Sequence, residues 1–148
     1  MIDLVEQLLL QQNECSLSWI RADDSPAATV VSFVWANQSL WMTALAGSGR
    51  VRALERRPRA AVVVSGKGTT LGVSRCVSMQ GRCVVRREQE IREWFFPAFA
   101  SAVLPDSQKG AQMMASMMSG AENLVLQFLP ERYIPYDSHD MMTRANNL

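Results

Sequence analysis

The chain has 148 residues, a formal net charge of +1 and 48% hydrophobic residues. This length suits one compact domain over residues 1–148, and no apolar run reaches the roughly 20 residues of a membrane helix. The near-neutral charge argues against a nucleic-acid partner, because such proteins usually carry a basic excess. The first residues are amphipathic and start with an acid, unlike a secretory signal. We therefore expect a cytoplasmic protein with neither a membrane nor a nucleic-acid partner.

The residues that most often bind metals or form disulfides are few. Cys15, Cys76 and Cys83 are an odd number of cysteines and include no CxxC motif, so we expect reduced, mostly buried thiols. The single histidine, His139, lies near the C-terminus, where we expect it to be exposed. No close group of His and Cys predicts a metal site, and no nucleophile motif assigns a catalytic residue.

The first half of the chain predicts a helix followed by strands. Apolar residues recur at helical spacing over residues 2–13, which indicates an amphipathic helix. Alternation over residues 16–21 and a β-branched run over residues 27–35 predict two strands. Residues 40–45 form the return strand of a tight hairpin that begins in the second strand.

A short helix and two further strands follow. Residues 49–57 place apolar side chains on one side and arginines on the others, with Ser48 as the N-cap. Residues 59–65 and 73–86 predict strands, and Gly81 indicates a bulge or bend in the second of them.

Two helices and a last strand complete the chain. Residues 87–102 begin as a helix that Pro97 should break or kink, and residues 106–119 predict another helix. Residues 122–137 predict a strand interrupted at Pro130, at an edge or a bulge. Because short turns join most of the six strands, we expect a mainly β fold with flanking helices, whose antiparallel sheet closes toward a barrel.

The stretch ALAGSGRVRALERRPRAAVVV, residues 44–64, concentrates positive charge beside a flexible turn. A helix N-terminus offers free backbone N–H groups and partial positive charge, and glycines beside a serine let a ligand approach closely. Together with guanidinium groups this predicts a phosphate site, in which Ser48 donates its hydroxyl and Arg50 or Arg52 binds the phosphate. The alternative is a solvated surface helix, with Arg52 and Arg56 facing water.

This stretch and the hairpin before it resemble the FMN-binding split-barrel family, whose members are similar to pyridoxamine 5'-phosphate oxidase. The resemblance runs from about Ser16 to Val85, and residues 130–137 resemble the usual ending of the family. The motif WMTALAGSGRVRALERRPRAAVVV carries it through Met42-Thr43, Ser48-Gly49-Arg50, Leu54 and Pro58-Arg59. The resemblance implies a six-stranded antiparallel split β-barrel that binds FMN as a homodimer.

The resemblance also implies the residues of the cofactor site. Ser48 and Arg50 match the residues that hold the FMN phosphate, and Thr43 matches a residue along the flavin. The strand around Ser32 would face the polar edge of the ring with its backbone. The implied cofactor-binding residues are Val31, Ser32, Phe33, Met42, Thr43, Ser48, Arg50 and Arg52.

The function implied by the resemblance is that of an FMN-dependent oxidoreductase acting on a small molecule. The substrate is unassigned, because residues 133–148 lack the tryptophan and arginine that bind substrate in oxidase members. In some relatives the long strand carries a glutamine where we place Cys76. The alternative is a non-catalytic split barrel that binds a flavin, a deazaflavin or haem.

The apolar residues of the last two helices have two interpretations. They either cap the barrel core or form a dimer surface or a wall of the flavin pocket. Trp35 and Trp41 have the same two interpretations, with core packing or stacking beside a flavin. The helical residues concerned are Trp94, Phe95, Phe96, Phe99, Met113, Met114, Met117 and Met118.

Overall fold

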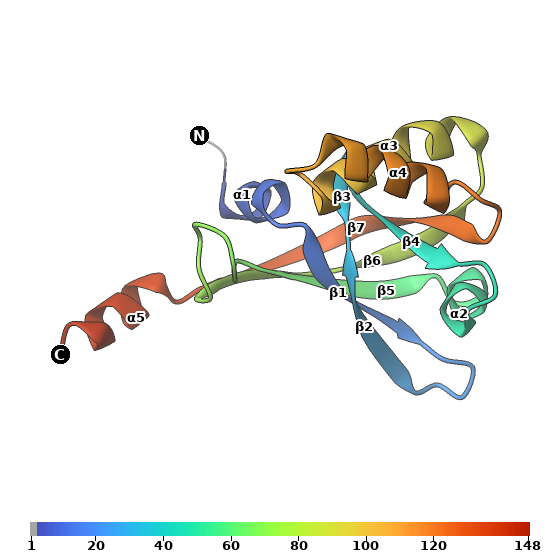
Figure 1. Ribbon diagram of the computed structural model, residues 1–148. Helices are drawn as coiled ribbons and strands as arrows, with labels where there is room; N and C mark the ends of the chain where they lie inside the picture. Colours follow the sequence, from blue (N-terminus) through green and yellow to red (C-terminus); the bar gives the residue numbers. More distant parts are fainter. Residues whose placement is uncertain (1–2) are drawn as a thin grey trace.

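The computed structural model describes residues 3–148, which fold around one curled antiparallel sheet of seven strands (Figure 1). Residues 14–20 alternate between the barrel interior and the outside, as half-buried strands do, whereas residues 39–42 and 124–128 are buried on both sides. The strands are β1 (Glu14–Ile20), β2 (Pro26–Ser32), β3 (Val34–Ala36), β4 (Ser39–Leu45), β5 (Arg59–Ser65), β6 (Arg75–Arg86) and β7 (Asn123–Asp137).

The order of the strands shows how the sheet closes. The order is β2-β1-β5-β6-β7-β4-β3, so β2 and β3 lie at opposite edges of the sheet. In the chain, however, these two strands are separated by Phe33 alone. The two edges must therefore meet at this residue, which turns the curled sheet into a split barrel. The predicted mainly β barrel with flanking helices is confirmed.

One predicted strand is in fact two. Residues 27–35 were expected to form a single strand, but β2 pairs with β1 and β3 pairs with β4. The chain changes partner at Phe33, which is 1% exposed and donates its N–H to the carbonyl oxygen of Asn13 at 2.9 Å. The barrel consequently has seven strands rather than six.

Helices cover the barrel on several sides (Figure 1). The four helices expected from the sequence are present, and Ile2, predicted within the first of them, lies outside the described residues. A fifth helix after the last strand was not predicted, and none of its residues is buried. The helices are α1 (Leu4–Gln11), α2 (Gly49–Arg56), α3 (Gln89–Val103), α4 (Gln108–Met118) and α5 (His139–Asn146).

Two clusters of buried apolar residues stabilise the fold. The first fills the barrel and includes Leu17, Met42 and Phe128, each fully buried. The second lies between the sheet and the pair α3 and α4, and it contains Trp41 and the phenylalanines of α3. Trp41 packs edge-on against Trp94 with ring centroids 4.9 Å apart. These aromatic residues therefore pack in the core, which is the first of the two interpretations from sequence.

Two prolines and one glycine occupy positions where they could disturb a helix or a strand, namely Pro97, Pro130 and Gly81. Helix α3 runs unbroken through Pro97, because this residue is exposed and the hydrogen bond it cannot donate lies on the solvent side. The predicted bulge is present at Gly81, where the pairing of β6 and β7 shifts register. Strand β7 continues through Pro130, so the predicted interruption is wrong, but the predicted bulge at Pro130 is confirmed, because Gly81 pairs with Pro130 and Gln80 with Arg132. Beyond Phe128 only β6 pairs with β7, which leaves that segment an edge where proline is tolerated.

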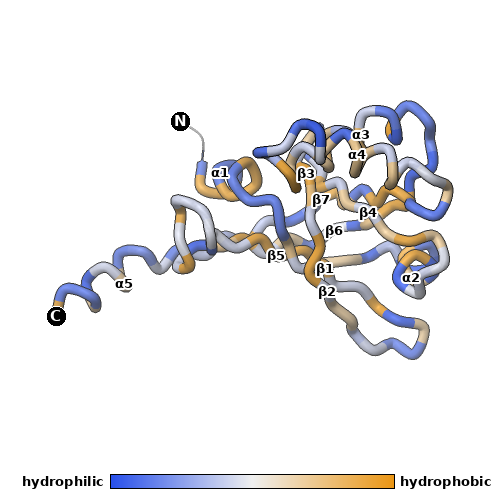
Figure 2. The backbone as a smooth tube through the Cα atoms, in the orientation of Figure 1, coloured by the Kyte–Doolittle hydropathy of each residue, from blue (hydrophilic) through white to orange (hydrophobic). Residues whose placement is uncertain are grey.

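The end of the chain extends away from the barrel (Figure 1). Figure 2 shows that hydrophobic residues gather in the strands, while α5 is mostly hydrophilic. Within residues 3–148, no helix has both the length and the hydropathy that a bilayer crossing requires. Several large apolar side chains on this extension are exposed, namely Tyr133, Ile134, Tyr136, Met141 and Met142.

Candidate functional site

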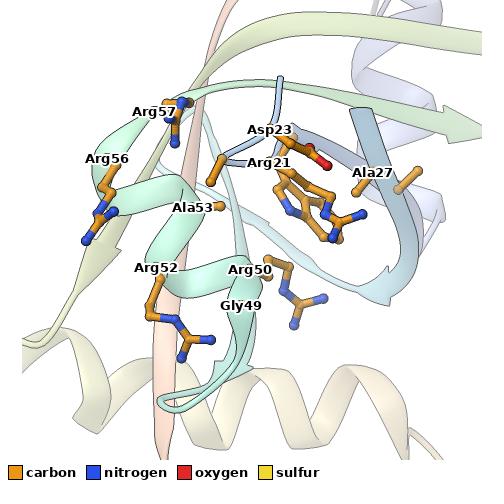
Figure 3. Close-up of a pocket in the computed structure, with 12 residues that line it drawn as sticks. Arg21, Asp23, Ala27, Gly49, Arg50, Arg52, Ala53, Arg56 and Arg57 are labelled. Atoms are coloured by element: carbon orange, nitrogen blue, oxygen red, sulfur yellow. The ribbon is translucent and has the colours of Figure 1, made fainter. Parts of the chain in front are cut away.

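A cleft of about 640 Å³ lies between α2 and the hairpin of β1 and β2 (Figure 3). Five positive side chains and one negative side chain line it, so it favours an anionic ligand. Most of the other lining residues are small, which leaves space between the helix and the hairpin. The charged residues are Arg21, Arg50, Arg52, Arg56, Arg57 and Asp23, and the others are Trp19, Ala22, Ala27, Ala28, Gly49 and Ala53.

Helix α2 brings its N-terminus to one end of this cleft. Ser48 caps the helix with an extended backbone (φ −72°, ψ 148°), and its Oγ accepts the N–H of Val51 at 3.4 Å, as the sequence predicts. Val51 and Leu54 are buried against the barrel. Because these apolar residues turn one side of α2 toward the barrel, its arginines face the cleft or the solvent.

Arg50 is the most constrained of the cleft arginines. Its Nη2 donates to the carbonyl oxygen of Thr43 at 3.3 Å, and its Cζ lies 5.9 Å from the ring centroid of Trp19. Burial lowers the pKa of Arg50, while the nearby Cys83 raises it. The Nε atom of Arg50 is buried and has no hydrogen-bond partner. A buried donor of this kind needs an acceptor, and a ligand in the cleft can supply one if the guanidinium turns toward it.

Arg52 closes the turn before α2. Its Nη1 donates to the carbonyl oxygen of Gly47 at 2.8 Å. This contact holds the glycine-flanked turn against the helix and leaves the remaining guanidinium nitrogens available to a ligand. Arg52 is exposed, so it differs from the half-buried Arg50.

The cleft arginines differ from other arginines of the protein in their partners. Across residues 3–148, the salt bridges join Arg75–Asp137, Arg82–Glu131, Arg86–Glu88 and Arg87–Glu55, and none involves a cleft arginine. Asp23, the one acid of the cleft, accepts hydrogen bonds from the hydroxyl and the N–H of Ser25, and that hydroxyl is the main cause of its lowered pKa. The cleft therefore has an excess of positive charge, and none of its arginines forms a salt bridge with another described residue.

The sequence-predicted phosphate residues meet at one corner. Arg50 and Arg52 line the cleft, and Ser48 adjoins them at the start of α2. Thr43 reaches this corner through its carbonyl oxygen, whereas its hydroxyl donates to the carbonyl oxygen of Leu124 at 2.9 Å.

The other predicted cofactor residues lie away from the cleft. The side chains of Phe33 and Met42 are buried in the barrel core, so only their backbone could reach a ligand. Val31 packs against the same core. Ser32 pairs with Glu14 at the end of β2. None of these four residues lines the arginine cleft.

Sequence reasoning missed the half of the cleft that comes from the β1–β2 hairpin. Trp19 and Arg21 are two residues apart, a spacing that places neighbours on one face of a strand. Trp19 pairs with Ala27 on β2, so the small residues of β2 lie across from it. This alternation was visible in the sequence, but the position of the hairpin over α2 depends on the closed barrel.

The thiols and the histidine lie outside the cleft. Cys83 is buried in the core, and this burial raises its pKa to about 12 although Arg50 acts to lower it. Cys76 pairs with Ser65 and Tyr136 at the start of β6. His139 is exposed, as expected. In the part of the chain that the structure describes, no group of three or more His, Cys, Asp or Glu could hold a metal ion.

Comparison with solved structures shows the same fold in proteins of low sequence identity. A conserved hypothetical protein from Mycobacterium tuberculosis is 17% identical with a TM-score of 0.79, covering 96% of this chain and 89% of that chain. A FAD-binding protein from Mesorhizobium loti is 15% identical with a TM-score of 0.64, covering 89% and 91%. An F420 reductase is 15% identical (TM-score 0.61; 90% and 98%), and the heme storage protein of Vibrio cholerae is 9% identical (TM-score 0.63; 88% and 90%).

Comparison at the level of sequence gives the family. No curated protein matches the chain. The sequence model of the family described as Pyridoxamine 5'-phosphate oxidase matches residues 1–125, which include the whole barrel up to the first residues of β7 and both sides of the arginine cleft. The chain belongs to the pyridoxamine 5'-phosphate oxidase family.

Proposed function

We propose that this protein binds FMN, with the phosphate at the N-terminus of α2. The observation that carries the proposal is the buried Nε of Arg50, which lacks an acceptor in a cleft whose arginines form no salt bridge within residues 3–148. An unsatisfied buried donor costs about 1–3 kcal/mol. A phosphate oxygen beside Arg50 would remove that cost and neutralise the local positive charge.

The residues at this corner fit a phosphate. The helix N-terminus contributes backbone N–H groups and partial positive charge. Ser48 contributes a hydroxyl, and Arg50 and Arg52 contribute guanidinium nitrogens on the same turn. In this arrangement Thr43 lies along the flavin, and the backbone of Val31, Ser32, Phe33 and Met42 borders it.

The activity we propose is that of an FMN-dependent oxidoreductase acting on a small molecule. A bound flavin supplies transfer of a hydride or an electron pair, while the protein binds it, orients it and keeps water from it. The family to which the chain belongs supports a flavin, and so does the name of the FAD-binding relative of the same fold.

The second candidate is a non-catalytic protein of the same fold that binds a flavin, a deazaflavin or haem. Two relatives are named for F420, which is a deazaflavin, and for heme. The phosphate corner would serve a deazaflavin equally well. It favours a flavin-type cofactor over haem, because the single histidine, His139, lies on α5 and does not line the cleft.

We also propose that the protein is a cytoplasmic homodimer. The exposed apolar residues Tyr133, Ile134 and Tyr136 follow the free edge of β7, where a second copy could cover them. The three cysteines are free thiols, which suits a reducing compartment. Sedimentation of the purified protein tests the dimer directly.

The test of the proposed cofactor combines a spectrum with two variants. The purified protein should show flavin absorbance bands, or acquire them on titration with FMN, rather than a Soret band. Arg50→Ala should weaken FMN binding about tenfold or more, because a charge-assisted contact contributes roughly 1.5–3 kcal/mol. Arg56→Ala is the matched control: Arg56 also lines the cleft, but it is exposed and lies in the last turn of α2, away from the proposed phosphate. Equal FMN titrations for Arg50→Ala and the parent would contradict the placement of the phosphate.

A further inference from the structure

The side of α2 that faces the hairpin carries an arginine at each end. Arg50, Ala53 and Arg57 are three and four residues apart, so they lie on one side of the helix, and all three line the cleft. Figure 3 shows Arg50 and Arg57 at the two ends of α2 with Ala53 between them. At 1.5 Å per residue, seven residues separate them by about 10 Å along the helix. The cleft therefore has two positively charged ends.

Both of these arginines carry a buried donor without an acceptor. Among residues 3–148, the buried side-chain nitrogen and oxygen atoms that lack a hydrogen-bond partner are Arg50 Nε and Arg57 Nη1. The flavin phosphate of the proposed function accounts for the first. It does not account for the second, because the two side chains start about 10 Å apart along the helix and lie at its opposite ends in Figure 3.

The protein itself offers Nη1 of Arg57 no acceptor. Its backbone N–H caps the end of α2 by donating to the carbonyl oxygen of Ala53 at 2.8 Å, but its Nη1 bonds to none of the terminal carbonyl groups. Asp23 is the one carboxylate of the cleft; it accepts hydrogen bonds from Ser25, keeps its negative charge and makes no salt bridge to Arg57. Arg21, an exposed residue that lines the cleft from the hairpin, adds a further positive charge; it acts on Asp23 electrostatically but forms no salt bridge with it.

We propose that the cleft binds a second phosphate group through Arg57 and Arg21, carried by a nucleotide. This inference rests on the proposed function, in which the first phosphate belongs to FMN. The indole of Trp19 and the small side chains Ala22, Ala27, Ala28 and Ala53 line the same cleft, and Arg50 lies over the indole, so a planar base has aromatic and guanidinium groups beside which it can stack. The second phosphate belongs either to the adenylate half of a flavin dinucleotide or to a separate phosphorylated nucleotide that binds beside FMN.

The experiment compares three ligands on the full-length protein by calorimetric and absorbance titration. FMN probes the first phosphate, FAD probes an adenylate joined to it, and adenosine 2',5'-bisphosphate added to the FMN-loaded protein probes a separate nucleotide. The variants are Arg57→Gln and Arg21→Gln. Arg59→Gln is the matched control, because it removes the same charge two residues away from Arg57 but outside the cleft.

We expect Arg57→Gln to weaken FAD or the bisphosphate roughly tenfold while FMN affinity changes less than about twofold. Whichever of the two ligands responds identifies the source of the phosphate. Arg21→Gln should act in the same direction, and since Arg21 is exposed this variant should keep the melting temperature of the parent.

Two results would overturn the second phosphate site. The first is that Arg57→Gln and Arg59→Gln bind FAD and the bisphosphate equally well. The second is that the parent binds FAD no more tightly than FMN and does not bind the bisphosphate. Failure of FMN to bind the parent would instead contradict the proposed function. In that case, bisphosphate binding that depends on Arg57 in the flavin-free protein would still support the second site.

Discussion

The Nη2 atom of Arg50 donates a hydrogen bond to the carbonyl oxygen of Thr43, 3.3 Å away, and so joins the start of α2 to the end of β4. The two residues are separated in sequence by a turn that contains Gly47 and Ser48. This bond occupies one nitrogen of the guanidinium and fixes its plane, which leaves Nε as the donor without a partner. The same side chain therefore both holds the turn and faces the proposed phosphate.

Lysine in place of Arg50 separates these two roles. Arg50→Lys keeps the positive charge but loses the fork that can bond Thr43 and a ligand together. We expect FMN binding to weaken by roughly threefold, which is less than for Arg50→Ala. Quenching of flavin fluorescence measures both variants. Equal losses for the two variants would show that geometry, rather than charge, governs the contact.

Two substitutions of Ser48 distinguish helix capping from anion binding. Ser48→Ala removes the N-cap and should lower the free energy of unfolding by about 1 kcal/mol. Ser48→Asp retains a capping oxygen and favours the helix dipole, so its stability should match the parent. The added carboxylate should nevertheless repel a phosphate and weaken FMN binding more than Ser48→Ala does. Urea unfolding and FMN titration provide the two readouts, and FMN binding by Ser48→Asp at parental affinity would contradict the phosphate site.

The close approach of β6 and β7 makes Gly81 intolerant of a side chain. A Cβ at this position would collide with the carbonyl oxygen of Leu129, which is backbone and cannot move aside. We expect Gly81→Ala to lower the free energy of unfolding by roughly 2–4 kcal/mol. Gly47→Ala is the control, because a Cβ there meets no atom within 4 Å. Thermal melts of the two variants should differ clearly, and similar melting temperatures would show that the bulge relaxes.

The buried thiols of Cys15 and Cys83 should not react with alkylating reagents until the pH is strongly alkaline. Burial raises the pKa of both Cys15 and Cys83 to about 12 from an ordinary value of 9.0. Iodoacetamide at pH 8 should therefore modify only the half-exposed Cys76 in the folded protein, and all three thiols after unfolding. Intact-mass measurement counts the adducts, and rapid modification of two or three thiols in the folded protein would contradict the core assignment.

The same two thiols should lower the stability of the folded protein as the pH becomes alkaline. Their pKa is higher in the folded protein than in the unfolded chain, so the unfolded chain loses protons first as the pH rises. Their contribution to stability is complete below pH 9.0 and is lost as the pH rises toward about 12. Replacing Cys83 with alanine should reduce the loss of stability between these values in urea unfolding experiments.

Local signals in the sequence predicted most of the elements and one corner of the site. The β-branched run of β5 and the cap at Ser48 depend on neighbouring residues alone, and both match the prediction closely. The family motif placed Arg50 and Arg52 at the start of α2, where they line the cleft. Helix α5 was not predicted, because it is short and mostly polar and none of its residues is buried.

The features that sequence could not supply depend on closure of the barrel. Nothing local marks Phe33 as the point where the chain leaves β1 for β4, because its neighbours are all compatible with one long strand. The contribution of Trp19 and Arg21 to the cleft has the same origin. The hairpin that carries them faces α2 only after distant strands have paired.

Phe33 is the single residue that links the edge strands β2 and β3, and it restricts where residues can be inserted or deleted. Side chains alternate between the two sides of a strand. One residue inserted or deleted at Phe33 would therefore turn all side chains of either β2 or β3 to the opposite side of the sheet. Both strands already have fixed partners in β1 and β4. We therefore expect natural relatives to vary more in the loop at residues 67–70, after the crowded Gly66, while keeping a single residue between the two edges of the sheet.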